Sequence, residues 1–264
     1  MSERKKQSRF MIIFVIIILV FVALFVYMFG GDIILSMPWN KQKAADAAQE
    51  YLAKTYQREM QHISTNYPPF NPFGRDYTVF FSPVDIPDLH FQVMVNRAFI
   101  VYEKQPVPDN PELYFSPDSY YLSYFEYYIE QPLQKFADDI WGTDVRVFAS
   151  TVDGFGNYRT PYIFNEQMTA REMEPYLKYD IYISNSRTLD NSLKAEEAMK
   201  MLQLIEFIKE NANTPEEVNF GYIINKEEND SKTSDSKSWI WFKNWAEITS
   251  VEEIENAMDE RWFS

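Results

Sequence analysis

The sequence predicts an α+β protein in which a single N-terminal transmembrane helix precedes two further domains. From Phe10 to Phe29, twenty residues without a charge are rich in Ile, Val, Leu and Phe. A helix of that length is about 30 Å long, enough to cross a bilayer. Beyond it, short β-branched and aromatic segments alternate with amphipathic helical segments. Only seven glycines, no cysteine and 17% aromatic residues favour compact cores without disulfides.

Four basic residues precede the apolar segment: Arg4, Lys5, Lys6 and Arg9. Cationic flanks stay on the cytoplasmic side during insertion. We therefore expect a cytoplasmic tail over 1–9, an anchor over 10–31 with the lipid bilayer as partner of residues 10–29, and extracytoplasmic domains thereafter in a single-pass protein of the cell membrane. The segment ends without a small-residue cleavage site, so we interpret it as retained; late cleavage near Ser36 is the alternative.

The first extracytoplasmic domain is predicted over residues 32–103. A helix over 41–60 carries a narrow apolar face, and three β-branched or aromatic segments follow it at 77–81, 91–95 and 99–102. One helix followed by an antiparallel sheet resembles the cystatin-like and PepSY-like small domains.

The same half of the chain also resembles the YfjL-like proteins, uncharacterised anchored proteins of Gram-positive bacteria. The resemblance is carried by a basic N-terminus, one apolar helix and the stretches AADAAQEYLAKTY, RDYTVFF and HFQVMV. It covers residues 1 to about 100 and implies location and architecture only, because no active site comes with it.

Residues 104–117 hold four prolines and are predicted to be a linker, so that a second α+β domain fills 118–264. Its first helix is expected to be kinked or broken near Pro132. A hairpin is expected around 152–157 and an amphipathic helix over 190–213. Two capping boxes predict helix starts at the pairs Thr169 with Glu172 and Ser250 with Glu253. Two strands are expected around a charged tip, KEENDSKTSDSK.

Aromatic residues surround nearly the whole circumference of the helix that begins near residue 119, more than one core-facing stripe can hide. One interpretation is burial between the domains; the other is a recognition surface for a protein, sugar or peptide, because Tyr is enriched in such contacts. The residues of this possible interaction surface are Tyr120, Tyr121, Tyr124, Tyr127 and Tyr128.

Other candidate sites are weaker. Trp239, Trp241 and Trp245 alternate at the strand period and are interpreted first as core, with a sugar-stacking platform as the alternative. VDGFGN, residues 152–157, offers oxygens for calcium but lacks the acids of an EF-hand loop, so a hairpin turn is preferred. Glu126 and Glu130 have the spacing of one helical turn, which a solvated helix face explains as well as glycoside hydrolysis does.

Catalytic templates fail throughout the sequence. Without cysteine there is no thiol nucleophile, and His62 and His90, the only histidines, lie in no triad or zinc motif. No phosphate-binding glycine loop is present, and a net charge of −14 repels nucleic acid. We expect no enzyme, catalytic residue, cofactor or metal, and no nucleic-acid partner.

The sequence therefore favours a non-enzymatic, membrane-anchored interaction or sensing module, with a membrane or cell-wall protein as a possible partner. An inhibitor or modulator of a surface enzyme is the alternative, suggested by the cystatin-like order of elements. A hydrolase acting on wall polymers is the third hypothesis.

Overall fold

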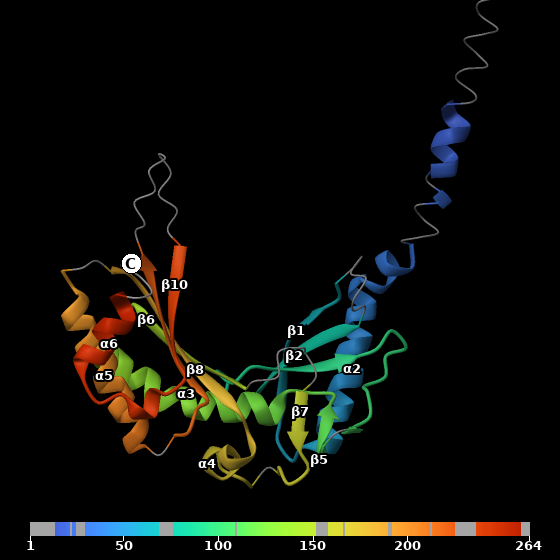
Figure 1. Cartoon of the computed structure of the whole chain (residues 1–264). Helices are drawn as coiled ribbons and strands as arrows, with labels where there is room; N and C mark the ends of the chain where they lie inside the picture. The colour runs from blue at the N-terminus through green and yellow to red at the C-terminus, as the bar shows by residue number, and fades with distance from the viewer. Residues whose placement is uncertain are drawn as a thin grey trace, which may run out of the picture. The chain divides into compact units, whose positions relative to one another are not determined.

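The fold was analysed in a computed structural model of the whole chain (Figure 1). It describes residues 14–21, 23–24, 30–68, 76–108, 110–151, 158–165, 167–189, 192–211, 213–224 and 236–259. The predicted cytoplasmic tail over 1–9 and the turn residues 152–157 lie outside these residues. The strands on either side of the turn, Val145–Thr151 and Tyr158–Pro161, belong to different sheets, so the hairpin predicted there is wrong.

The predicted fold class needs a correction at the N-terminus. Among the residues that the structure describes, no helix is both long enough and apolar enough to cross a membrane. The described part of the chain is therefore α+β with three sheets and without the predicted transmembrane helix.

The described chain divides into two compact units. The first comprises Met1–Gln105 with Ser116–Ser119, and the second comprises Pro106–Phe115 with Tyr120–Ser264. Strands β4 (Gln105–Val107) and β5 (Asn110–Ser116) occupy most of the segment predicted as a linker. Two of its four prolines lie in these strands: Pro106 in the edge strand β4 and Pro111 near the start of β5, which are positions where strands tolerate proline.

In the first unit, helix α2 (Pro38–Thr55) packs on an antiparallel sheet of strands β1 (Met60–Asn66), β2 (Tyr77–Pro83) and β3 (Phe91–Val95). The predicted strand over 99–102 is reduced to a single antiparallel bridge between Val101 and Val95 of β3. The third strand of the sheet is β1, at the other edge beside β2, although its sequence MQHISTN is mostly exposed and lacks an apolar alternation.

A buried carboxylate ties the first unit together. Asp118 accepts hydrogen bonds from the hydroxyls of Tyr51 and Tyr56 on and after α2, at 2.5 and 2.8 Å. The neighbouring carbonyl of Pro117 accepts from the backbone N–H of Met94 in β3 at 2.8 Å. This contact explains why residues 116–119 belong to the first unit, although they follow β5 in the chain.

The second unit is built on a four-stranded sheet in the order β10-β9-β8-β6. The elements are β6 (Val145–Thr151), β8 (Tyr179–Leu189), β9 (Glu217–Ile224) and β10 (Ser236–Phe242). Strands β8 and β9 are parallel and the other pairs are antiparallel. Parallel neighbours need a crossover, which helix α5 (Lys194–Glu210) provides.

Among the described residues, helices cover one face of this sheet and none covers the other. Helix α3 (Tyr120–Trp141), α5 and α6 (Val251–Met258) lie on that side in Figure 1. Their buried side chains meet the inward residues of the strands, among them Val147, Ile181, Ile183, Val218, Phe220 and Ile240. Helix α3 continues through Pro132, so the predicted break is wrong, while the alternative, a kink, stays a prediction.

The remaining elements are short. Strand β7 (Tyr158–Pro161) pairs with β5 in a second sheet of order β4-β5-β7. Helix α4 (Ala170–Met173) leads into the 3-10 turn η1 (Glu174–Tyr176), and η2 (Trp245–Glu247) precedes α6. Both predicted capping boxes are confirmed, one at the start of α4 and the other at the start of α6.

Candidate functional site

The five predicted interaction residues all lie on α3, and the structure exposes them unequally. Tyr120 and Tyr121 are buried, Tyr124 and Tyr127 are half-buried, and Tyr128 is 42% exposed. The rings of Tyr120 and Tyr124 are 6.1 Å apart and those of Tyr124 and Tyr128 are 4.6 Å apart, so one turn of helix separates successive members. The role of this tyrosine cluster in binding stays a prediction.

Glu126 and Glu130 do not lie on a solvated helix face. The carboxylate of Glu126 accepts from the backbone N–H and the hydroxyl of Thr151, at 2.8 and 2.7 Å, and that of Glu130 accepts from the N–H of Ala149 at 2.8 Å. One turn further, Gln134 accepts from the N–H of Val147 at 2.7 Å. Three acceptors of α3 thus satisfy three donors on the outer edge of β6.

This ladder works because two spacings match. Four residues of helix rise about 6 Å, and two residues of strand rise about 6.6 Å, so side chains one turn apart on α3 meet alternate N–H groups of β6. Strand β6 is an edge of the sheet, and edge strands need protection. Burial raises the pKa of Glu126, and burial together with the charge of Glu126 raises the pKa of Glu130 to about 7.

The face of the four-stranded sheet opposite the helices carries a row of aromatic and polar side chains. The sequence predicted some of these residues to be core and did not mark the others. Strand register puts four residues in one row across the sheet. They are Trp241, Asn219, Tyr182 and Phe148. Trp239 stands beside Gly221 in the next row. We call the four aromatic residues, Phe148, Tyr182, Trp239 and Trp241, the aromatic face.

The rings of the aromatic face contact one another. Phe148 stacks on Tyr182 with centroids 5.0 Å apart and an interplanar angle of 6°, and Trp239 meets Tyr182 edge-on at 5.7 Å. A Cβ at Gly221 would lie 2.9 Å from the Trp239 indole, so only glycine lets that ring rest on the backbone. Trp241 is 54% exposed and Phe148 is 39% exposed.

Polar atoms without partners accompany these rings. Asn219 is 0% exposed, and neither its side-chain oxygen nor its nitrogen has a hydrogen-bond partner among the described residues. The Oδ1 atom of Asp180, which neighbours Glu217 on the same face, is also unpartnered there. Burial, and secondarily the charge of Glu217, raises the pKa of Asp180. Three of the five such atoms in the described residues belong to this face.

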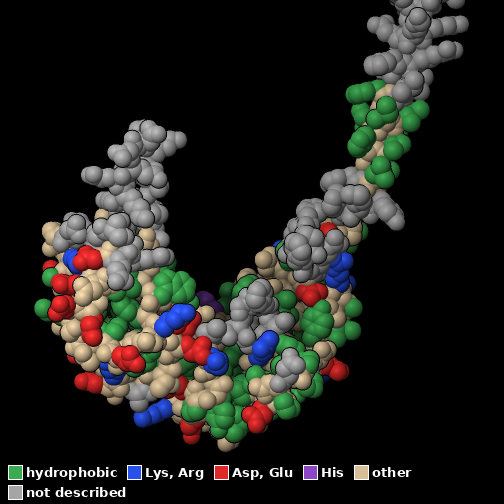
Figure 2. Space-filling model, viewed as in Figure 1, with side chains coloured by type: hydrophobic (Ala, Val, Ile, Leu, Met, Phe, Trp, Pro, Cys, Tyr) green, Lys and Arg blue, Asp and Glu red, His purple; other side chains and the backbone are tan. Residues whose placement is uncertain are grey.

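The three tryptophans of the sequence pattern therefore separate. Trp245 is buried, and its indole N–H donates to the carbonyl of Pro215 at 2.9 Å. Trp239 and Trp241 instead stand on the face of β10 opposite the core, while Ile240 and Phe242 between and after them point to the core. Interpretation of all three as core is wrong, because the described helices lie on one side of β10. Figure 2 shows hydrophobic side chains at the surface where Figure 1 places β10.

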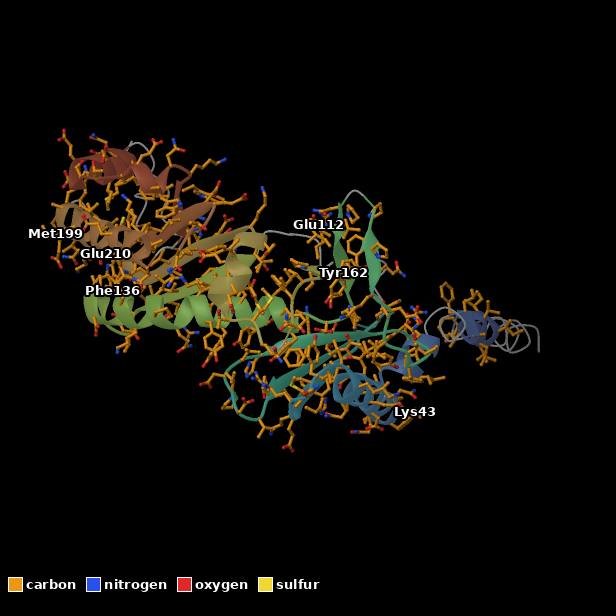
Figure 3. The ribbon with its side chains drawn as sticks, turned by 90° about the horizontal axis from the view of Figure 1, so that it is seen from below. Lys43, Glu112, Phe136, Tyr162, Met199 and Glu210 are labelled. Carbon is orange, nitrogen blue, oxygen red and sulfur yellow. The ribbon has the colours of Figure 1, made fainter. Side chains whose placement is uncertain are left out.

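A cleft of about 940 Å³ lies beside the small sheet of the second unit. Exposed side chains of Tyr162, Ile163 and Tyr176 line it, and Figure 3 shows Tyr162 beside Glu112, whose carbonyl accepts from the Tyr162 N–H at 3.0 Å. Lys178, a further lining residue, forms an ion pair with Glu216 at 2.8 Å. Nothing in this lining indicates a class of ligand.

Metal coordination finds no support in the described ranges, where no group of three or more His, Cys, Asp and Glu side chains is placed to hold an ion.

Comparisons with known proteins add little. No protein-family model and no curated protein matches the sequence. A crystal structure of a DUF5037 family protein from Ruminococcus gnavus is similar over 84% of this chain and 99% of its own, at 10% identity and a TM-score of 0.39. A likeness at that TM-score carries no argument about fold or function, and the resemblance to YfjL-like proteins stays a prediction.

Proposed function

We propose that this protein is a non-enzymatic interaction module whose second unit binds a partner on the aromatic face. The observation that carries the proposal is the side chain of Asn219, which is fully buried beside exposed rings without a hydrogen-bond partner in the described residues. Leaving a buried amide unpaired costs about 1–3 kcal/mol. Buried polar groups in folded proteins nearly always have a hydrogen-bond partner, and a bound ligand would supply the partners that this amide lacks.

The composition of the face supports the same proposal. Aromatic residues are enriched at recognition surfaces, and Trp241 and Phe148 are both exposed. The opposite face of the sheet already supplies the core of the unit. The aromatic rings are thus not required to complete that core.

Photo-crosslinking in the host cells tests this proposal. A photoreactive amino acid placed at Phe148 is expected to give a reproducible adduct, which the second substitution Trp241→Ala removes. The matched control places the same group at Met199, which is 53% exposed on α5. An adduct equally strong from both positions, or one that is insensitive to Trp241→Ala, would contradict the proposal.

The extracytoplasmic location and the lipid and cell-wall partners stay predictions from the sequence, as does the tyrosine cluster of α3. The aromatic face is favoured over that cluster for two reasons. Two of the five tyrosines are buried, and in the described residues no unpaired amide like that of Asn219 accompanies the tyrosines.

A further inference from the structure

We propose that the aromatic face binds a neutral oligosaccharide; this inference rests on the proposed function and names its ligand class. It follows from three properties of the face: flat rings, unpaired polar groups beside them, and charges of both signs that offset one another.

The rings supply the apolar half of the interaction. The stacked pair of Phe148 and Tyr182 and the indole of Trp239, which rests on the backbone of Gly221, present ring surfaces within one patch. Aromatic rings carry a negative face and attract positively polarised hydrogens. The C–H groups on one side of a pyranose are such hydrogens, arranged in a plane.

The unpaired groups supply the polar half. The amide of Asn219 has two donors and an acceptor, and Asp180 offers an acceptor oxygen. A hydroxyl both donates and accepts, so a sugar can satisfy the amide and the carboxylate together. Trp241 neighbours Asn219 in the row and is largely exposed. Its side chain is the group that moves aside so that the sugar can reach the Asn219 amide. An aliphatic partner would leave all these atoms buried and unpaired.

Charge decides which sugars fit. Asp180 and Glu217 lie side by side on this face. Two bases offset them: Lys243 is 3.4 Å from the carboxylate of Glu217, and Arg146 is exposed on the same side of β6 as Phe148. A face whose charges offset one another gives no net attraction to a charged polymer, so the ligand is neutral.

The size of the face sets the length of the ligand. Four strands at about 4.8 Å spacing place Trp241 and Phe148 about 14 Å apart. That span suits a short oligosaccharide lying across the strands better than a single sugar.

The test titrates the full chain with chitotetraose, a neutral oligomer of N-acetylglucosamine, and with cellotetraose, while tryptophan fluorescence and binding heat are recorded. We expect saturable binding of at least one of them, weakened about tenfold or more by Trp241→Ala and by Asn219→Leu. Met199→Ala, the control of matched exposure, is expected to bind like the wild type. Urea unfolding of each variant shows that the fold is kept.

Three results would overturn the inference. They are no binding of either oligosaccharide at millimolar concentration, binding unchanged by Trp241→Ala, and preferred binding of an anionic polymer such as polygalacturonate. If neither sugar binds but the Trp241-dependent adduct from position 148 forms with a protein, the inference fails and the proposed function stands. If neither sugar nor adduct is found, both fail.

Discussion

Replacing Glu130 by Gln is expected to make the protein more stable at pH 8 and to leave its stability at pH 4.5 unchanged. In the folded chain, the carboxyl of Glu130 accepts from the N–H of Ala149, and burial with the nearby charge of Glu126 raises its pKa to about 7. The amide oxygen of Gln accepts the same hydrogen bond without a charge. The neighbouring Gln134 already makes this contact with Val147.

The magnitude follows from linkage. Because the folded pKa, about 7, lies above the ordinary value of 4.5, the folded chain holds the proton more tightly than the unfolded chain. The contribution to stability is complete below pH 4.5 and is lost as the pH rises to about 7. The full difference corresponds to about 3 kcal/mol, and partial solvent exposure of Glu130 reduces it to about 1–2 kcal/mol.

Urea unfolding at pH 4.5, 6 and 8, followed by tryptophan fluorescence, measures the effect. The control is Glu210→Gln on α5, an exposed glutamate (Figure 3) that is expected to change neither the midpoint nor its pH dependence. A Glu130→Gln variant that loses stability at pH 8, or that keeps the wild-type pH profile, would refute the reasoning about the edge of β6.

Three further substitutions are expected to have distinct effects on unfolding. Gly221→Ala places a methyl group 2.9 Å from the Trp239 indole; urea unfolding should show a loss of about 1–3 kcal/mol, and tryptophan fluorescence should change. Glu197→Gln replaces a buried carboxylate that accepts hydrogen bonds from Trp141 and Tyr222, both at 2.6 Å, and the substitution removes the ion pair with Lys200. The same measurement should show a loss of about 2–4 kcal/mol, whereas Glu196→Gln, at an exposed glutamate, should cost less than about 0.5 kcal/mol. Asn219→Leu removes two unpaired buried atoms and should stabilise the fold by about 1 kcal/mol; a large loss would show that the amide is paired in the folded protein.

Local signals in the sequence predicted the elements that depend on neighbours in the chain. Both capping boxes form as expected because each needs only residues three positions apart. The amphipathic helix predicted over 190–213 is α5, and Ala198, Ile205 and Ile208 on its apolar side are fully buried. Strand β1 was missed because its exposed, polar residues give no periodic signal.

The candidate site depends on partners that no local pattern reveals. Alternation in β10 separates Trp241 from Ile240, but it does not tell which of the two faces the helices will cover. Glu126 and Glu130 meet β6, which lies about twenty residues further along the chain, so their spacing alone resembles a solvated face. The burial of Asn219 could not be predicted from its own segment, because it depends on β8 and β10, which pair with β9 on its two sides.

Hydroxyl-radical footprinting of the protein in its host cells and after purification tests most directly whether the aromatic face is occupied. Trp241 and Met199 are similarly exposed, at 54% and 53%, so the labelling of Met199 reports any general change of access. The account predicts that Trp241 and Phe148 are protected in cells and labelled in the purified protein, while Met199 is labelled in both. Equal labelling of Trp241 in cells and after purification would contradict the claim that this face binds a partner.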